Sequence, residues 1–291
     1  KGYRVLVIEK GKWFHRPEDF PKTNWNLRKW LWMPRIGFAG LFKMSFFRHV
    51  TVLSGVGVGG GSLVYANTLP YPKKEFFHSG SWNNLADWEK ELQPYYRVAE
   101  QMLGTEEHPY TGRSEKVMQQ LAEELGPETT FHRTRVAVHF GKPGVTVPDP
   151  YFNGKGPDRT GCTLCGGCML GCRYNAKNTL DKNYLHLAQQ CGATIWAERE
   201  VVDVRPLNSD GSAGYEIHVK DALSWFGKKY TVRAKGVVFA GGVMGTMRLL
   251  LRLKKTSLPR ISEKIGQGIR TNSESLIGVT TKEKISFSEG I

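Results

Sequence analysis

The sequence predicts an α/β fold, in which helices accompany a parallel sheet and a small antiparallel sheet is added. Residues 3–8 form a short, nearly continuous apolar run, which is typical of a parallel strand buried on both faces. Residues 194–207 and 215–221 alternate around an NSDG turn, as antiparallel strands do. Residues 237–239 read as a further buried strand that leads through two glycines into a leucine-rich helix. A chain of 291 residues is long enough for one complex domain or two interleaved domains.

The first predicted strand ends in Glu9. In a dinucleotide-binding βαβ unit, an acidic residue at the end of the second strand hydrogen-bonds the adenosine ribose. The G-x-G-x-x-G sequence that accompanies it should lie about 20 residues upstream, whereas the sequence begins at Lys1. Two interpretations are open: Glu9 is an ordinary strand-end charge, or it is a ribose ligand in a fragment that lacks its first βα unit.

Aromatic and basic side chains crowd residues 13–50. One interpretation is a long excursion that packs onto the core. The other is a lid, in which four aromatic residues face an apolar substrate or a membrane surface: Trp30, Trp32, Phe46 and Phe47. Because no clean helical stripe spans the segment, packing onto the core is the favoured expectation.

A glycine-rich segment follows at residues 53–67, LSGVGVGGGSLVYAN. A surface linker would carry polar residues, whereas these glycines are flanked by four apolar side chains, Val56, Val58, Leu63 and Val64. We therefore expect a buried backbone, which a flat or charged ligand can approach closely and whose N–H groups act as donors. No G-K-[ST] follows, so the segment is not a P-loop.

Residues 71–135 are expected to be mostly helical. Apolar side chains recur at helical intervals on both sides of Pro94, which should interrupt the first helix. A second helix is expected between Ser114 and the stop at Gly126. A loop-like stretch then leads into the cysteines, and the helix after them should end at Gly192.

Four of the five cysteines lie within eleven positions at the spacing C-x2-C-x2-C-x3-C: Cys162, Cys165, Cys168 and Cys172. In bacterial ferredoxins such a turn supplies three thiolates to one cluster, so a single [4Fe–4S] cluster would need Cys172 or Cys191 as its fourth ligand. A four-thiolate zinc site is a second interpretation, and a compact loop of thiols or disulfides is a third. This clustering does not indicate a secreted disulfide scaffold, so we expect a reducing, cytoplasmic compartment.

The formal net charge is +14, which favours anionic partners in general. The lysines and arginines are scattered along the chain, and no RNA-binding or zinc-finger signature is present. We therefore expect a solvated basic surface and no nucleic-acid partner. No run of 18 apolar residues occurs, so no transmembrane helix is expected.

Five stretches occur in a characteristic order: RVLVIEKG, GVGVGGGSLVYAN, AKNTLDKNYL, VVFAGGVMGTMRLLLR and IGQGIRTN. Together they resemble the glucose–methanol–choline (GMC) family of FAD oxidoreductases, specifically its cholesterol-oxidase-like branch. The resemblance implies a Rossmann-like FAD-binding domain interleaved with an α+β substrate or cap domain. The implied order is FAD-binding in residues 1–11, a lid and flavin-contact loop in 12–70, a mostly helical cap in 71–160, the Cys-rich loop in 161–175, FAD-binding again in 176–275, and the start of a truncated substrate domain in 276–291.

The resemblance also implies which residues bind FAD. Glu9 matches the ribose ligand, Asn67 lies near the isoalloxazine, and the backbone of Val201 contacts the adenine. The glycine-rich loop passes close to the flavin and its pyrophosphate, and a strand end packs against the FAD. The loop residues are Gly55, Gly57, Gly59, Gly60, Gly61 and Ser62, and the strand-end residues are Ala240, Gly241 and Gly242.

In that family a histidine near the C-terminus, paired with an asparagine or a second histidine, takes the proton of the substrate alcohol while hydride leaves for the flavin. The matching position would lie beyond Ile291, so no catalytic residue is assigned within this chain. We expect ordinary surface or core roles for His132, His139, His186 and His218.

The resemblance thus implies an FAD-dependent enzyme that oxidises the CH–OH group of a bulky apolar alcohol, sterol-like or long-chain. Its electron acceptor would be oxygen or a redox protein, and the aromatic segment admits a peripheral membrane contact. A metal centre at the cysteines, iron–sulfur ahead of zinc, would relay electrons from the flavin to an external acceptor. The alternative function is that of an electron-transfer or metal-binding module in which the cysteine loop is the functional site.

Overall fold

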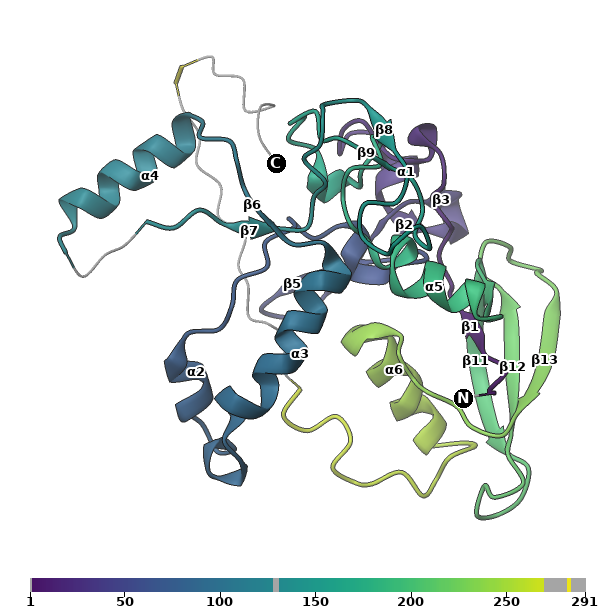
Figure 1. Ribbon diagram of the computed structural model, residues 1–291. Helices are drawn as coiled ribbons and strands as arrows, with labels where there is room; N and C mark the ends of the chain where they lie inside the picture. Colours follow the sequence, from purple (N-terminus) through teal and green to yellow (C-terminus); the bar gives the residue numbers. More distant parts are fainter. Residues whose placement is uncertain (1, 128–130, 270–281, 284–291) are drawn as a thin grey trace. The chain divides into compact units, whose positions relative to one another are not determined.

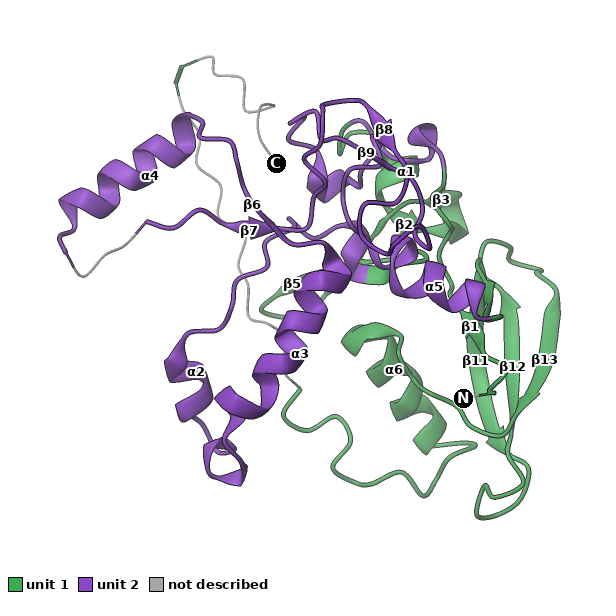
Figure 2. Ribbon diagram, viewed as in Figure 1, with its two compact units in different colours: residues 1–15, 23–60, 192–285 green, residues 16–22, 61–191, 286–291 purple. Residues whose placement is uncertain are grey.

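The computed structural model describes residues 2–127, 131–269 and 282–283. The chain divides into two compact units (Figure 2). The first unit consists of residues 1–15, 23–60 and 192–285, and the second of residues 16–22, 61–191 and 286–291. Each unit is described by itself.

The first unit contains a parallel strand pair, as the sequence predicts. Strand β1 (Leu6–Ile8) pairs in parallel with β10 (Thr194–Trp196), so that Ile8 lies opposite Trp196. The hydrogen bond from the Glu9 N–H to the Trp196 carbonyl, 3.0 Å long, continues this pairing to the end of the strand. The strand is shorter than its apolar run, and its side chains are half-buried rather than buried on both faces.

An antiparallel sheet of three strands completes this part of the unit: β11 (Arg199–Pro206), β12 (Tyr215–Asp221) and β13 (Lys229–Ala234) (Figure 1). The NSDG turn joins the first two strands, which confirms the predicted pair. Helix α6 (Gly242–Lys254) packs against the sheet, and its Leu253 is buried among Val204, Ile217 and Val219. The alternating pattern of the strands thus supplies one apolar face, and the helix covers it.

The predicted buried strand at residues 237–239 is wrong. This segment has no strand geometry, and Val238 is 90% exposed. A buried parallel strand needs neighbours on both edges to satisfy its N–H and C=O groups, and no strand in the described part of the chain pairs with this segment.

The aromatic segment at residues 13–50 forms short elements: α1 (Leu27–Trp30), β2 (Trp32–Met33), η2 (Pro34–Ile36), β3 (Phe38–Ala39) and β4 (Phe42–Phe46), which pairs with β5 (Thr51–Gly55). Trp32 and Phe42 are buried, and Trp30 lies tilted against the Phe42 ring. Phe46 and Phe47 are exposed at the end of the β4–β5 hairpin. The packed interpretation therefore describes the start of the segment, and exposed aromatic side chains occur at its end.

The second unit carries most of the helices: α2 (Lys74–His78), α3 (Trp88–Leu103), α4 (Arg113–Glu124) and α5 (Tyr184–Gln190). It also contains two short strand pairs, β6 (Glu106–Glu107) with β7 (Arg135–Val136) and β8 (Thr146–Val147) with β9 (Arg159–Thr160). Single turns of 3-10 helix join them: η1 (Pro17–Asp19), η3 (Gly60–Leu63, which begins at the end of the first unit), η4 (Asn83–Leu85), η5 (Cys168–Leu170) and η6 (Leu180–Lys182).

The helical prediction for residues 71–135 is confirmed in type, but the expected interruption at Pro94 is wrong. Helix α3 runs through Pro94 without a break. Both of its ends are capped, by the Asp87 side chain, which accepts from the Lys90 N–H at 3.3 Å, and by Gly104 in the left-handed region. These caps and the remaining helical hydrogen bonds hold the helix despite the missing N–H of the proline. Within the described ranges, no helix is long and apolar enough to span a membrane.

Candidate functional site

Glu9 stands at the end of β1 and holds the glycine-rich segment by its carboxylate. Its Oε1 accepts hydrogen bonds from the N–H of Gly11 at 2.7 Å and of Gly57 at 3.2 Å. Burial raises the pKa of Glu9, and the two N–H donors and Lys10 offset part of that rise. Its Oε2 accepts no hydrogen bond from the described residues, so this oxygen is free to accept one from a ligand hydroxyl.

Gly11 makes the close approach of these two segments possible. A Cβ atom on Gly11 would overlap the backbone nitrogen of Gly57 and lie 2.6 Å from the Gly57 Cα and 2.8 Å from the Val56 carbonyl carbon. All of these are backbone atoms, so no side-chain movement would relieve the overlap. Gly11 was not among the residues predicted from the sequence; a glycine two residues beyond the strand-end acid was the available signal.

The glycine-rich loop has buried valine side chains at its start and an unobstructed main chain at Gly60 and Gly61. Val56 and Val58 are buried, which confirms the predicted burial of the segment. Gly59 and Gly60 adopt φ angles of 109° and 57°, in the left-handed region that favours glycine. A Cβ on Gly60 or Gly61 would meet no protein atom within 4 Å. A ligand can therefore reach the main chain at these two positions.

Beyond the loop, the chain is tied to the segment AKNTLDKNYL within the second unit. The hydroxyl of Ser62 accepts from the Leu180 N–H at 2.9 Å, and the hydroxyl of Tyr65 donates to the Asn178 carbonyl at 3.0 Å. Lys177 Nζ donates to the carbonyls of Leu63 at 3.1 Å and Tyr65 at 2.7 Å. Two stretches more than 100 residues apart in sequence therefore form one local structure.

Asn67 is fully buried and adopts a φ of 63°. Neither polar atom of its amide has a hydrogen-bond partner of good geometry in the described part of the chain. Its amide lies near the thiol of Cys168: burial raises the pKa of that thiol to about 11, and Lys177 and the Asn67 amide act against the rise. An unused, buried amide of this kind indicates a group that is absent from the bare chain.

The remaining predicted FAD residues lie in the first unit. Gly241 and Gly242 form the N-terminal end of α6, with Gly242 at a φ of 67°, and Ala240 precedes them. Ala240 and Gly242 line an open hollow of about 570 Å³. Val201 lies in β11 next to a register shift between Val201 and Asp203. This shift takes Val202 out of the paired register, and the Val202 carbonyl instead accepts a hydrogen bond from Arg252.

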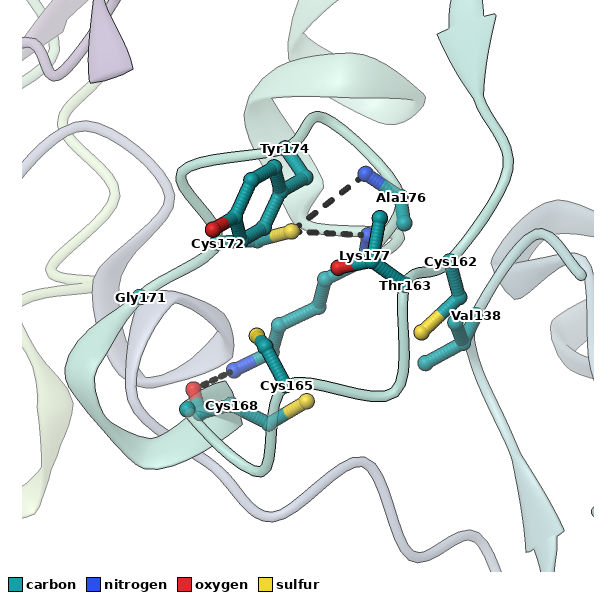
Figure 3. A pocket seen from close by; sticks show the side chains of 11 residues that line it. Val138, Cys162, Thr163, Cys165, Cys168, Gly171, Cys172, Tyr174, Ala176 and Lys177 are labelled. Carbon is teal, nitrogen blue, oxygen red and sulfur yellow. Dashed lines mark hydrogen bonds between the residues drawn. The ribbon is translucent and has the colours of Figure 1, made fainter. Parts of the chain in front are cut away.

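The four clustered cysteines line one pocket (Figure 3). Cys162 and Cys168 are buried, Cys165 and Cys172 are half-buried, and none of them forms a disulfide. Figure 3 shows the four sulfur atoms around a common space, with the Lys177 side chain crossing behind it. Cys191, the other candidate for a fourth ligand, is exposed after the end of α5 and does not line the pocket.

A site for a single metal ion is not present among the described residues. No group of three or more histidine, cysteine, aspartate or glutamate side chains there is arranged to hold a metal ion. Zinc needs its four thiolates at about 2.3 Å from one point. The predicted zinc alternative therefore has no support in the structure. The third interpretation, a compact loop of thiols or disulfides, agrees with the structure in its thiol form, because all four cysteines are free.

Comparison with known proteins gives two curated relatives along essentially the whole chain. The chain is 47% identical over 300 residues to the cholesterol oxidase of Acinetobacter baumannii, covering 100% of this chain and 54% of the relative. It is 44% identical over 288 residues to the cholesterol oxidase of Mycobacterium tuberculosis (strain H37Rv), covering 97% of this chain and 49% of the relative. This chain belongs to the cholesterol-oxidase-like branch of the GMC family.

The chain spans about half the length of these relatives. No family model matches it. Within this cholesterol-oxidase-like chain, the structure brings Glu9 and Gly57 together directly, and it joins Ser62 and Asn67 to the neighbourhood of Lys177. The role of Lys177 as a structural link was not predicted from the sequence, although its position inside AKNTLDKNYL was the available signal.

Proposed function

We propose that this chain forms the FAD-holding part of an oxidoreductase that oxidises the CH–OH group of a bulky apolar alcohol, sterol-like or long-chain. The observation that carries the proposal is the pairing of Glu9 with Gly57, which places a free carboxylate oxygen beside an open glycine loop. The name of the relatives supports the choice of an alcohol as substrate.

FAD, when bound, supplies the acceptor for the hydride that leaves the alcohol carbon. The residues of this chain bind and orient it. Glu9 Oε2 accepts a hydrogen bond from a ribose hydroxyl, and the main chain of the loop, whose Gly60 and Gly61 face open space, lets the pyrophosphate and flavin approach. The N-terminal end of α6 places partial positive charge and free N–H groups beside the hollow at Gly242, which suits a phosphate.

The proton of the substrate alcohol needs a general base, and we place that base outside this chain. Two histidines have other partners: His108 forms a hydrogen bond with its own turn at Tyr110, and burial lowers the pKa of His139, which packs against Tyr151. A histidine supplied by residues outside this chain, which spans about half the length of its relatives, would take this role. Oxygen or a redox protein would then reoxidise the flavin.

The test uses the full-length protein that contains this chain and measures flavin content and alcohol oxidation with cholesterol and a long-chain alcohol. Glu9→Gln keeps the size of the side chain but weakens the acceptor to the ribose, so bound flavin should fall at least several-fold. Glu124→Gln, on the exposed face of α4, is the matched control and should retain wild-type flavin content.

A full-length wild-type protein without bound flavin, or one that takes up no FAD on titration, would refute the cofactor assignment. Flavin content unchanged in Glu9→Gln would refute the role of Glu9 alone. Retained flavin with no alcohol oxidation would refute the substrate class.

A further inference from the structure

We propose that the pocket lined by Cys162, Cys165, Cys168 and Cys172 binds a [4Fe–4S] cluster. This site is additional to the alcohol oxidation proposed above and does not depend on it. All four thiols come from one loop of eleven residues, they are not used in disulfides, and all four line the same pocket (Figure 3).

The way the thiols are arranged favours a cluster over a single ion. A single ion draws its ligands to one point, and among the residues that the structure describes no such convergence occurs. In a four-iron cluster each thiolate binds a different iron at a corner of the core, so the sulfur atoms surround a space instead of meeting. No carboxylate or imidazole lines the pocket, and the rest of its wall is Val138, Ala176 and backbone around Gly167 and Gly171, with Thr163, Tyr174 and Lys177. The four thiols are therefore the metal-binding groups of this pocket, and thiolates are the usual ligands of iron–sulfur clusters.

Backbone N–H groups are already aimed at the sulfur atoms. The Leu164 N–H donates to Cys162 Sγ at 3.4 Å, and the N–H groups of Ala176 and Lys177 donate to Cys172 Sγ at 3.3 and 3.4 Å. Leu164, a bulky residue, holds a φ of 54° to do so. N–H donors to sulfur stabilise the negative charge of cluster thiolates and tune their potential. These donors reach two of the four sulfur atoms and favour the charged thiolate form of Cys162 and Cys172.

Two buried basic groups beside the pocket form no ion pair with the acidic residues that the structure describes. Lys177 is 0% exposed and Arg159 is 1% exposed. Arg159 donates to the carbonyls of Ala176 and Lys177, and Lys177 donates to those of Leu63, Tyr65 and Cys168. Asp181 lies near enough to act against the lowering of the pKa of both groups by burial, but its carboxylate forms its ion pair with Lys182 at 3.4 Å.

Buried charges that lack a counter-charge are costly. A [4Fe–4S]²⁺ core with four thiolates carries two negative charges, equal in number to these two cations, of which Lys177 lines the pocket and Arg159 interacts electrostatically with Cys172. The unused amide of Asn67, buried near the thiol of Cys168, supplies a further donor toward sulfur.

Lys177 also fixes where the cluster would lie. Its ammonium bridges the Cys168 carbonyl, at 2.9 Å, to the carbonyls of Leu63 and Tyr65, which follow the glycine-rich loop. The Lys177 side chain therefore links the pocket directly to Leu63 and Tyr65, which follow the glycine-rich loop in the sequence.

The experiment uses the full-length protein prepared anaerobically, with iron, acid-labile sulfide, zinc and flavin measured on the same samples. About four iron and four sulfide per chain are expected, with a paramagnetic signal after reduction by dithionite. Cys168→Ser and Cys165→Ala should each lose at least three quarters of the iron. Cys191→Ser is the matched control and should keep it. Flavin content and far-ultraviolet circular dichroism report whether each variant is folded.

Lys177→Met gives a readout that a purely structural lysine would not move. Removing a cation next to the cluster should shift its reduction potential to a more negative value, because the reduced cluster carries one more negative charge. Iron absent from the wild type after anaerobic preparation and after reconstitution with ferrous iron and sulfide would overturn the proposal, as would one zinc per chain. Equal iron loss in Cys191→Ser would overturn the ligand set. Because flavin is measured independently, these outcomes leave the proposed alcohol oxidation untouched.

Discussion

Gly61→Ala separates the cofactor-binding role of the glycine loop from its role in folding. Gly61 is exposed, its φ is outside the left-handed region, and a Cβ there would meet no protein atom within 4 Å. The added methyl group therefore has room in the cofactor-free protein. It would have none if FAD lies against the loop at this position.

The expected magnitudes differ between the two readouts. An alanine at an exposed site without contacts changes the free energy of unfolding by no more than about 0.5 kcal/mol. Forcing a methyl group into a filled space costs about 1–3 kcal/mol, which weakens FAD affinity by roughly 5- to 150-fold because 1.4 kcal/mol is a factor of ten. Gly11→Ala is the contrasting variant: its Cβ would overlap the backbone at Gly57, so it should lose about 1–3 kcal/mol of stability without any cofactor.

The assay pairs FAD titration followed by flavin fluorescence with urea unfolding of the cofactor-free full-length protein. Gly236→Ala, at an exposed site where a Cβ also meets nothing within 4 Å, controls for the glycine-to-alanine change itself. Wild-type FAD affinity in Gly61→Ala would refute the placement of FAD against this loop. A large loss of stability in Gly61→Ala would refute the open space that the structure shows there.

Two further predictions concern Glu9 and the core of the first unit. Burial raises the pKa of Glu9, and the charged form of its carboxylate is the better acceptor for a ribose hydroxyl, so FAD affinity should fall as the pH decreases through that raised pKa. The fall should occur at a higher pH than for an ordinary glutamate, whose pKa is about 4.3. FAD titrations from neutral to acidic pH measure this, and the same pH dependence of affinity in Glu9→Gln would contradict the role of Glu9. Leu253→Ala should lower the free energy of unfolding by about 2–5 kcal/mol, because the side chain is buried against the antiparallel sheet. Leu251 is exposed on the same helix, so Leu251→Ala should lower it clearly less. Equal losses in urea unfolding would show that α6 does not cover the sheet as described.

Local patterns predicted the elements whose stabilising contacts lie nearby in the sequence. The alternation in β11 and β12 with its NSDG turn, and the start at Ser114 and stop at Gly126 expected for α4, specify those elements because their hydrogen bonds are made within a few residues or within a hairpin. The run at residues 237–239 was misread because an apolar run becomes a parallel strand only where neighbouring strands accept its hydrogen bonds. Pro94 was misread because the capped ends and remaining bonds of α3 outweigh one missing N–H.

In the candidate site, too, some features could be predicted from the sequence and others only from the structure. The resemblance named Glu9 and the glycine loop, and the cysteine spacing named the four thiols. Neither could show that Gly11 lies against the backbone of Gly57, or that Lys177 and Arg159 are buried near the thiols and donate to backbone carbonyls. Gly11 and Gly57 are 46 residues apart, and Lys177 is held by the carbonyls of Leu63 and Tyr65, more than 100 residues away, so local pattern does not bring these groups together.

The sequence by itself determined the kinds of groups that this protein offers: a strand-end carboxylate, a loop almost free of side chains, and four thiols at a cluster spacing. The tertiary structure alone decided what those groups face. It left one oxygen of Glu9 without a hydrogen bond from the described residues, opened the loop at Gly60 and Gly61, and brought four thiols and the buried Lys177 into the lining of one pocket. The physical reason is that burial and counter-charge are properties of the surrounding space, which is filled by residues distant in the chain.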